Sequence, residues 1–304
     1  MKSVIVTGAN GFIGSTLINK LVEDGIKVLA IDVSFSPSHM PESDLVTTVE
    51  TFITDSDDLV EKIPDNQYDA FYHFAWAGVN GAIKANPIAQ IKNIEMAAIC
   101  MTVCKQIGCK KFLCAGTIAE QSVNSLPLLK KTSGGMMYGV AKHCTHLMLE
   151  NYSKNIGQPF VWMQLSNIYG PGNMTGNLVS YTLSELFAGN NPCFGPANQP
   201  YDFVSVEDTI EAIKRLGERD TIKNSYYIGS GQPRLLKDYL LTIGEAMGCP
   251  EKIGIGKRPD DGIRYSMEMF DADDTKSEIG EYITKSFEEG VEETISWMKN
   301  NKAL

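Results

Sequence analysis

The 304-residue sequence predicts an α/β fold, and two observations support that prediction. In the first half, short β-rich runs alternate with longer helical patterns, the order that builds a parallel sheet with helices on both faces. After Asn167 the alternation ends, and stretches rich in Gly and Pro separate mixed elements. Crossovers between parallel strands have a fixed hand. The first half therefore predicts a Rossmann-type, doubly wound parallel sheet, and the rest predicts a smaller C-terminal α/β domain.

The elements of the first half are predicted from runs of β-branched and aromatic residues and from longer stretches of helical periodicity. The first run, SVIVT, has the composition of a buried strand, and a helical pattern follows it after a Gly-rich turn. The third strand is the weakest, and an acidic turn follows it. The expected strands are Ser3–Thr7, Lys27–Asp32, Val46–Ile53, Tyr68–Phe74, Lys110–Ala115 and Pro159–Ser166, and the expected helices are Ile13–Glu23, Pro87–Ile107 and Met136–Asn155.

Two stretches of the second half, Gly170–Gly176 and Gly189–Pro200, cannot be regular structure because Gly and Pro interrupt them. Between and after them we expect mixed elements. These are helices over Glu207–Leu216, near Leu235–Met247 and over Phe287–Met298, and a short strand at Tyr226–Ile228. We expect residues 1–168 to form the Rossmann domain, with a return of about 203–228, and residues 169–304 to form the second domain.

The composition argues against several classes of protein. Lys and Arg number 27 against 37 Asp and Glu, and the net charge of −10 disfavours wide contact with nucleic acid or an anionic membrane. No apolar stretch reaches the roughly 18 residues that a membrane span needs. The seven cysteines include no CxxC pair and no secretory signal is evident, so we expect free thiols in a reducing cytoplasm. No metal site is expected, although His143 and His146 have a compatible spacing.

The first strand runs into TGANGFIG, whose glycines follow the pattern G-x-x-G-x-x-G directly before a helix. In that pattern Gly8 permits the tight turn, Gly11 lets the backbone approach a pyrophosphate, and Gly14 lets the helix lie close to the strand. The helix N-terminus adds free N–H groups and the positive end of its dipole. Strand, turn and helix in this order predict dinucleotide binding. The residues expected to contact the dinucleotide here are Gly8, Asn10, Gly11, Phe12, Ile13 and Gly14.

Two carboxylates, Asp32 and Asp55, lie at or just after the ends of the second and third predicted strands. Asp32 ends the second strand, where a carboxylate accepts hydrogen bonds from the adenosine ribose hydroxyls and repels a 2′-phosphate. The segment Val33–Ser36 contains no Arg or Lys that would bind such a phosphate. The sequence therefore favours NAD over NADP as the cofactor. Asp55, after the third strand, is expected either to contact the adenine side of the cofactor or to cap a helix.

Tyr138 and Lys142 lie four residues apart at the start of a predicted helix, so both side chains are expected on one face. A free tyrosine titrates near pH 10 and is a poor base at neutral pH. A nearby ammonium group favours the phenolate form. Tyr138 is therefore a candidate proton acceptor for a substrate hydroxyl, or a donor to a carbonyl in the reverse direction.

These motifs together resemble the extended short-chain dehydrogenase/reductases, the NAD-dependent epimerase/dehydratase family, and the resemblance covers nearly the whole chain. Besides TGANGFIG, the segment HFAWAG is similar to the family's segment after strand four, and AGTIAE is similar to the end of its strand five. NIYGPG resembles the turn that opens the family's substrate domain, and YDFVSVED resembles a later stretch. In this chain these segments are His73–Gly78, Ala115–Glu120, Asn167–Gly172 and Tyr201–Asp208.

The resemblance implies roles for individual residues. Thr117 would hydrogen-bond the reacting oxygen of the substrate, Tyr138 would move its proton, and Lys142 would hold the nicotinamide ribose while depressing the pKa of Tyr138. NAD would be the cofactor, with Phe74 and Ala75 among its contacts, and a nucleotide-diphosphate sugar would be the substrate. The residues expected to bind the sugar nucleotide are Trp76, Asn167, Asn177, Leu178 and Arg264, although Trp76 could instead fill the core and Arg264 could be a solvated surface residue.

One departure from the family pattern bears on the reaction. The family's dehydratases have Asp-Glu after the catalytic Ser or Thr, whereas Ile118 and Ala119 follow Thr117 here, which disfavours elimination of water. Asp32 selects NAD, which is mostly oxidised in the cytoplasm, and this favours an enzyme that begins by removing a hydride. We therefore expect C4 epimerisation. The alternatives are a 4-keto-sugar reductase or dehydrogenase, an oxidoreductase of a non-sugar carbonyl and a non-catalytic dinucleotide-binding protein. A homodimer is also expected.

Overall fold

The computed structural model describes residues 1–79, 81–129, 132, 134–260 and 265–301. The chain divides into two compact units that interleave along the sequence. The first comprises Met1–Val123, Ser133–Gln164 and Ile210–Tyr226, and the second comprises Asn124–Thr132, Leu165–Thr209 and Tyr227–Leu304. The domain limits expected from the sequence, 1–168 with a return of about 203–228, and 169–304, remain a prediction.

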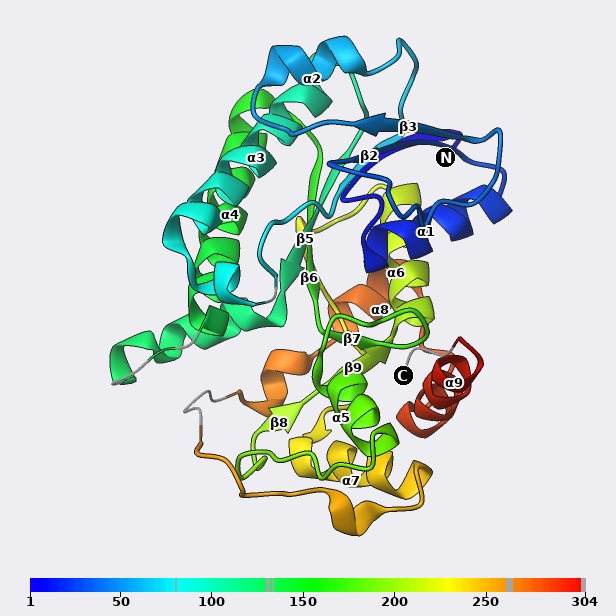
Figure 1. Cartoon of the computed structure of the whole chain (residues 1–304). Coiled ribbons are helices and arrows are strands. Elements are labelled where there is room, and N and C mark those ends of the chain that lie inside the picture. Colours follow the sequence, from blue (N-terminus) through cyan, green and yellow to red (C-terminus); the bar gives the residue numbers. More distant parts are fainter. Residues whose placement is uncertain (80, 130–131, 133, 261–264, 302–304) are drawn as a thin grey trace. The chain divides into compact units, whose positions relative to one another are not determined.

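A seven-stranded sheet with the strand order β10-β6-β5-β4-β1-β2-β3 confirms the predicted Rossmann-type architecture (Figure 1). Strand β1 pairs in parallel with β2 on one side and with β4 on the other. The strand order therefore reverses at β1, and the carboxyl ends of β1 and β4 flank the point where such sheets bind ligands. The strands are β1 (Ser3–Thr7), β2 (Lys27–Asp32), β3 (Val46–Glu50), β4 (Ala70–His73), β5 (Phe112–Thr117), β6 (Phe160–Leu165) and β10 (Ser225–Ile228).

Helices cover both faces of this sheet, with α3 and α4 on one face and α1 and α6 on the other (Figure 1). The core beneath α3 and α4 contains Phe71, Phe112 and Trp162, together with buried cysteines of α3. In the described residues no helix combines the length and apolarity that a membrane crossing requires. The helical elements here are α1 (Phe12–Glu23), α2 (Ser56–Lys62), η1 (Ala82–Ala85), α3 (Pro87–Gln106), η2 (Ile118–Leu128), α4 (Gly134–Ile156) and α6 (Val206–Glu218).

Some elements of the sheet region differ from the sequence-based expectation. Strand β3 ends at Glu50 instead of Ile53, and helix α2 occupies the segment expected to be an acidic turn. Strand β5 continues to Thr117, two residues past the expected end at Ala115. Because of this extension, Thr117 is the last residue of a strand beside the reversal point of the sheet, where ligand-binding groups gather.

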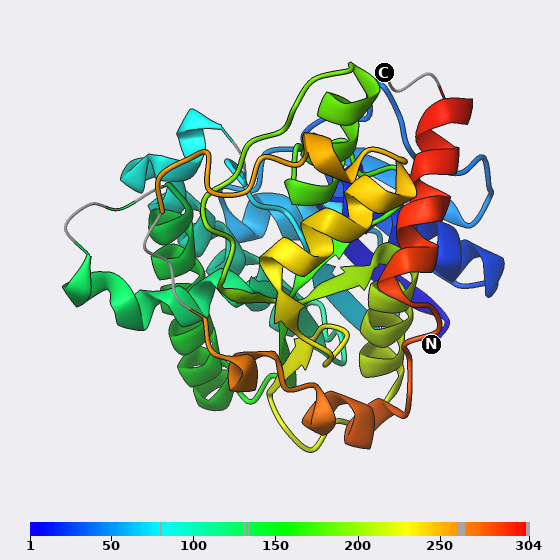
Figure 2. The same cartoon turned by 90° about the horizontal axis from the view of Figure 1, so that it is seen from below.

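The second unit has its own core and two small strand pairs. Strand β7 pairs in parallel with β9, and β8 pairs antiparallel with β11. Helices α7 and α9 lie side by side (Figure 2), and Phe203, Tyr239 and Phe287 pack with their rings in contact in the core. The elements are β7 (Asn167–Tyr169), α5 (Leu178–Phe187), β8 (Pro200–Tyr201), β9 (Phe203–Ser205), β11 (Arg234–Leu235), α7 (Leu236–Ala246), η3 (Pro250–Lys252), η4 (Met267–Phe270), α8 (Asp273–Ile279) and α9 (Phe287–Asn300).

Candidate functional site

The glycine loop between β1 and α1 is packed so tightly that two of its glycines have no room for a side chain. Gly8 has a φ of +68°, and a Cβ atom there would lie 2.6 Å from the backbone nitrogen of Ala75. A Cβ on Gly14 would lie 2.2 Å from the carbonyl oxygen of Gly8. The loop is therefore held against the segment that follows β4, which contains Phe74 and Ala75.

The N-terminus of α1 is prepared for an anion. Its N-cap residue is Gly11, which has no side chain to accept from the first-turn N–H groups, and the first turn contains no acidic residue. Phe12 and Ile13 open the helix beside this cap. Free N–H groups and the helix dipole at such an end favour a pyrophosphate. The cradle therefore fits the phosphates of a dinucleotide, as the sequence predicts.

Asp32 is tied to the same loop. Its Oδ2 accepts from the backbone N–H of Asn10 at 2.8 Å, and its Oδ1 accepts from the N–H of Val33 at 2.7 Å. The Asn10 side chain donates to the carbonyl oxygens of Ser34 and Pro37. A carboxylate oxygen has two lone pairs, so each oxygen of Asp32 can also accept from a ribose hydroxyl. The contact between Asp32 and the cofactor remains a prediction.

We expect the protein to bind NAD at least about tenfold more tightly than NADP, or ~1.4 kcal/mol, because Asp32 would oppose a 2′-phosphate with a like charge. Titration of both cofactors into the apoprotein measures the ratio. Asp32→Asn should narrow it, whereas Asp57→Asn, an exposed control on α2, should not. Tighter binding of NADP by the unaltered protein would show that Asp32 does not face the ribose.

Asp55 is the N-cap residue of α2. Its Oδ1 accepts from the backbone N–H groups of Asp57 and Asp58 at 2.9 and 3.0 Å. Asp55 therefore caps a helix, which is one of the two roles expected for it. The cap explains why a helix forms where an acidic turn was expected. A contact between Asp55 and the adenine side of the cofactor remains a prediction.

Thr117, Tyr138 and Lys142 come together within the first unit. Thr117 ends β5, and Tyr138 and Lys142 lie one turn apart in α4. The Thr117 side chain lies close enough to the Tyr138 phenol to lower its pKa, and the Lys142 Nζ lies 5.9 Å from the centre of the Tyr138 ring. Gly139 makes this approach possible, because a Cβ there would lie 2.5 Å from the carbonyl oxygen of Ala119. The three candidate catalytic residues are therefore adjacent, and their roles in catalysis remain predictions.

The pKa of Tyr138 is set mainly by burial. Burial raises it above its ordinary value, the interaction with Thr117 lowers it, and the Glu120 carboxylate and the Cys114 thiol raise it further. Burial outweighs the charge effects on this pKa, and its depression by Lys142 remains a prediction. Burial also lowers the pKa of Lys142 to about 8, while Cys114 and Glu120 act to raise it.

Trp76 lies against these catalytic candidates. The Lys142 Nζ is 3.6 Å from the centre of its ring, a cation–π contact, and the same Nζ donates to the carbonyl oxygen of Ala115 at 2.7 Å. Trp76 meets Tyr138 edge to face at 6.1 Å, and its indole N–H donates to Gln90 at 2.9 Å. Trp76 therefore helps to fix Lys142, and its contact with substrate remains a prediction.

Three further side chains of this region have no role predicted from the sequence. The Nζ of Lys84, from η1, lies 5.0 Å from the centre of the Tyr138 ring, and burial lowers the pKa of Lys84. Gln90 holds the Trp76 indole, and Glu120 accepts from the backbone N–H of Thr117. Lys84 and Gln90 belong to no motif, and Glu120 ends the segment AGTIAE without a role assigned to it there, so only the fold identifies their contacts.

The remaining substrate candidates belong to the second unit or lie outside the described residues. Asn167 donates from its side chain to the carbonyl oxygen of Asp202 at 3.1 Å. Asn177 caps α5 by accepting from Ser180 at 2.9 Å, and Leu178 is the first residue of that helix. These amides already stabilise local structure, and their substrate contacts remain predictions. Arg264 lies outside the described residues.

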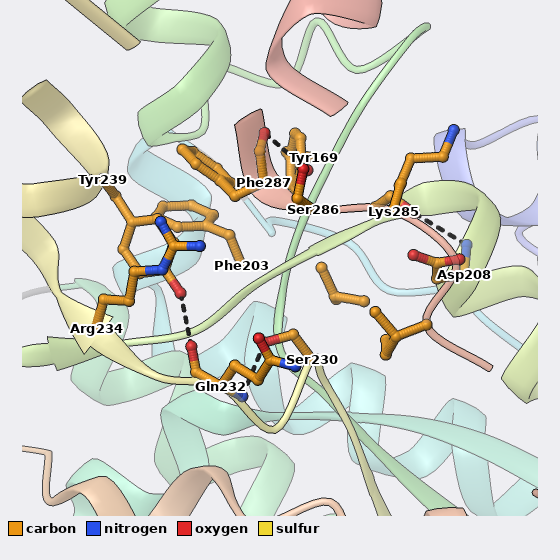
Figure 3. Close-up of a pocket in the computed structure, with 13 residues that line it drawn as sticks. Tyr169, Phe203, Asp208, Ser230, Gln232, Arg234, Tyr239, Lys285, Ser286 and Phe287 are labelled. Atoms are coloured by element: carbon orange, nitrogen blue, oxygen red, sulfur yellow. Dashed lines mark hydrogen bonds between the residues drawn. The ribbon is translucent and has the colours of Figure 1, made fainter. Parts of the chain in front are cut away.

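A cavity of about 60 Å³ lies inside the second unit, between β9, β11 and the start of α9 (Figure 3). Its two cations are already paired, since Arg234 lies 2.6 Å from Glu288 and Lys285 lies 2.6 Å from Glu293. Ser286 at its edge caps α9 in a capping box with Glu289. Because both cations already have carboxylate partners, this cavity is a poor site for an anionic substrate. Its residues stabilise the fold of the second unit.

Residues 4–229 match the sequence model of the NAD dependent epimerase/dehydratase family. A putative UDP-glucose 4-epimerase of Methanocaldococcus jannaschii is 25% identical over 98% of this chain and 99% of its own length. A dTDP-4-dehydro-6-deoxy-D-allose reductase of a Streptomyces species is 23% identical over 99% of this chain and 97% of its own length.

The fold is also shared with solved structures. A UDP-glucose 4-epimerase from Thermotoga maritima, solved with UDP-glucose, has a TM-score of 0.81 at 21% identity. The similarity covers 99% of this chain and 99% of that one. Both units of the chain therefore have counterparts in one known architecture.

Proposed function

The chain belongs to the NAD dependent epimerase/dehydratase family, and from that premise we propose that it interconverts a nucleotide-diphosphate sugar and its C4 epimer. The family expected from the motifs is confirmed, and NAD is the cofactor. The observation that most directly supports catalysis is the contact of Thr117 with Tyr138, beside Lys142. A protein that only bound dinucleotide would have no need of this arrangement.

The residues present fit the cofactor. The glycine loop and the N-terminus of α1 would hold the pyrophosphate of NAD, and Asp32 would hold the adenosine ribose. When bound, NAD supplies a hydride acceptor for C4 of the sugar and returns the hydride afterwards. Lys142, whose ammonium group is fixed by Trp76 and the carbonyl oxygen of Ala115, would hold the nicotinamide ribose.

The protein's own part in the chemistry is a proton transfer. Tyr138 would take the proton from the C4 hydroxyl as the C4–H bond breaks, which leaves a 4-keto sugar. Thr117 would keep the reacting oxygen in line with the phenol through its hydroxyl group. The sugar would then present its other face, and Tyr138 would return the proton to the C4 oxygen as the new C4–H bond forms.

The segment after Thr117 argues against dehydration. Ile118 is buried, and neither Ile118 nor Ala119 carries a group that can donate or accept a proton. The carboxyl group that follows them, Glu120, is 4% exposed and engaged with Trp162 and the Thr117 backbone. Elimination of water needs an acid and a base in addition to Tyr138, and this segment offers neither.

A 4-keto-sugar reductase is the second candidate, and the similarity to a dTDP-4-dehydro-6-deoxy-D-allose reductase favours it. The same residues would serve, with Tyr138 as the proton donor to the carbonyl oxygen. The two reactions differ in their cofactor balance, since a reductase consumes one NADH per sugar and an epimerase consumes none.

The nucleotide of the substrate can be found by ligand-dependent melting. With NAD present, we expect one of UDP, dTDP, GDP and CDP at about 100 times its Kd to stabilise the fold by ~2.7 kcal/mol, a shift of several degrees in Tm. We propose that Trp76, Asn167, Asn177, Leu178 and Arg264 are the residues that bind this ligand. If none of the four nucleotides raises the Tm, the proposed substrate class is wrong.

We propose that a second copy of this chain covers an apolar groove of about 700 Å³ between α3 and α4. Leu147 and Met148 line it and are 55% and 51% exposed, and Ile99 and Tyr152 add further apolar surface. Large apolar side chains exposed together on a folded protein mark interaction surfaces. The groove supports the homodimer that we expect for this chain.

Leu147→Glu should convert the dimer to a monomer, because it would bury a charge on both sides of a symmetric interface. Light scattering coupled to size-exclusion chromatography measures the mass. Leu241→Glu, which places the same charge on α7, should leave the dimer intact. A monomer in the unaltered protein, or a dimer in Leu147→Glu, would exclude this interface.

We further propose that the protein works in the cytoplasm. All seven cysteines are free thiols in the structure, and Cys100, Cys104, Cys109 and Cys114 are buried. Free thiols persist in a reducing compartment. NAD is available there as well.

A further inference from the structure

Glu120 is a buried carboxylate directly behind the candidate catalytic residues. Its side chain belongs to η2, three residues after Thr117, and the residue is only 4% exposed. A carboxylate is rarely buried to this extent unless hydrogen bonds replace its water. The partners of Glu120 therefore indicate what it does.

The carboxylate accepts from two N–H groups and lies close to a histidine nitrogen. Its Oε1 accepts from the backbone N–H of Thr117 at 2.7 Å, and both oxygens lie 3.2 Å from the indole nitrogen of Trp162. Its Oε2 lies 3.5 Å from the Nδ1 of His146, whose ring stacks on Trp162 at 4.8 Å. These groups come from β5, β6 and α4, so Glu120 joins three elements at one point.

Gly116 makes this arrangement possible. A Cβ at this position would lie 2.3 Å from the indole nitrogen of Trp162 and 2.7 Å from the Oε1 of Glu120. Any larger residue would separate the carboxylate from its two N–H donors. Gly116 and Glu120 therefore act together on Thr117, which follows Gly116 in the chain and donates its N–H to Glu120. Thr117 is the residue proposed to contact the substrate.

We propose that Glu120 is a positioning residue that fixes the backbone of Thr117, so that the Thr117 hydroxyl meets the Tyr138 phenol. The kinetic consequence of this proposal rests on the function proposed above. Thr117 is the last residue of β5, and its N–H is held by the Glu120 side chain. Loss of that acceptor would free the end of the strand and misplace the hydroxyl, and small displacements of catalytic groups are costly.

The charge of Glu120 has a second effect on the same residues. The groups that interact with it electrostatically are Tyr138, Lys142 and His146 from α4 and Cys114 from β5, whereas β6 contributes the uncharged indole of Trp162. Its negative charge raises the pKa values of both Tyr138 and Lys142. A neutral side chain at position 120 should therefore lower both pKa values.

Two substitutions separate the hydrogen bond from the charge. Glu120→Gln keeps an oxygen that can accept from Thr117 and removes the charge, whereas Glu120→Leu removes both. Glu61→Gln, on the exposed side of α2, is the control for a change of charge alone. We expect Glu120→Leu to lower kcat about 100-fold with little change in the Kd for NAD, and Glu120→Gln to keep kcat within about threefold.

The pH profile tests the charge effect. In kcat/KM for the C4-hydroxyl sugar, the rising limb reports the deprotonation of Tyr138, and Glu120→Gln should move this limb to lower pH. Full activity in Glu120→Leu would overturn the proposal. It would also be overturned if both variants lost the same share of kcat and the rising limb of the pH profile did not move. If Glu120→Leu does not fold, the proposal is tested by the pH profile of Glu120→Gln. A rising limb of kcat/KM that does not move to lower pH would then overturn it.

A readout without substrate separates this proposal from the proposed function. Hydrogen–deuterium exchange of the Thr117 amide should be slow in the unaltered protein and in Glu120→Gln, and faster in Glu120→Leu. If the unaltered protein turns over no nucleotide sugar, the function is wrong and the exchange still tests the positioning. Unchanged exchange of Thr117 in Glu120→Leu would show that Glu120 does not hold it.

Discussion

Tyr138→Phe should lower kcat by about 10² to 10⁴-fold and leave the Kd for NAD nearly unchanged. The phenol hydroxyl carries the proton in the proposed reaction, whereas the ring packs against Trp76 and beneath Lys84 and is retained in phenylalanine. Because this variant removes only one oxygen atom, the loss measures proton transfer and the fold is preserved. Steady-state kinetics and a cofactor titration give the two values.

Tyr152→Phe is the matched control for Tyr138→Phe. It removes the same atom from the same helix, where the Tyr152 hydroxyl lies 3.0 Å from that of Thr102. We expect its kcat to equal that of the unaltered protein. Near-normal turnover in Tyr138→Phe would remove this residue from the mechanism, and an equal loss in both variants would point to damage of α4.

Gly14→Ala should abolish measurable binding of NAD and destabilise the first unit by ~1–3 kcal/mol. The new Cβ would lie 2.2 Å from the carbonyl oxygen of Gly8, so either α1 or the loop must move. A moved loop misaligns the N–H groups that would hold the pyrophosphate. Calorimetric titration with NAD and a melting curve measure the two effects.

Asn19→Ala provides the comparison on α1, since Asn19 is exposed on the same helix and Ala favours helix. It should bind NAD normally. If Gly14→Ala bound NAD as tightly as this control, the glycine loop between β1 and α1 would not be the cofactor site.

The parts of the site that are local in sequence could be predicted from the sequence. The glycine loop lies between consecutive elements, and Tyr138 and Lys142 share a helix face because of their spacing alone. The contact of Thr117 with Tyr138 joins two distant segments, and only the resemblance to a family suggested it. Spacing within one segment carries no information on how two segments approach.

Glu120 shows what the sequence could not reveal. A glutamate in a polar turn is ordinarily exposed, and its burial depends on Trp162 from β6 and on the missing side chain of Gly116. The raised pKa of Tyr138 has the same origin, because burial is a property of the assembled fold. The two-residue strands β8 and β11 were missed for a related reason, since so short a segment has no periodicity.

In the proposed reaction the protein moves a hydride and a proton without net oxidation or reduction of the sugar. The most direct test mixes the purified enzyme with UDP-, dTDP-, GDP- and CDP-sugars and follows the C4 configuration together with absorbance of the reduced nicotinamide. We expect one pair of C4 epimers to interconvert to equilibrium while the absorbance of the reduced nicotinamide returns to its starting value. Stoichiometric consumption of NADH on a 4-keto sugar, with no exchange between C4 epimers, would contradict it and establish a reductase.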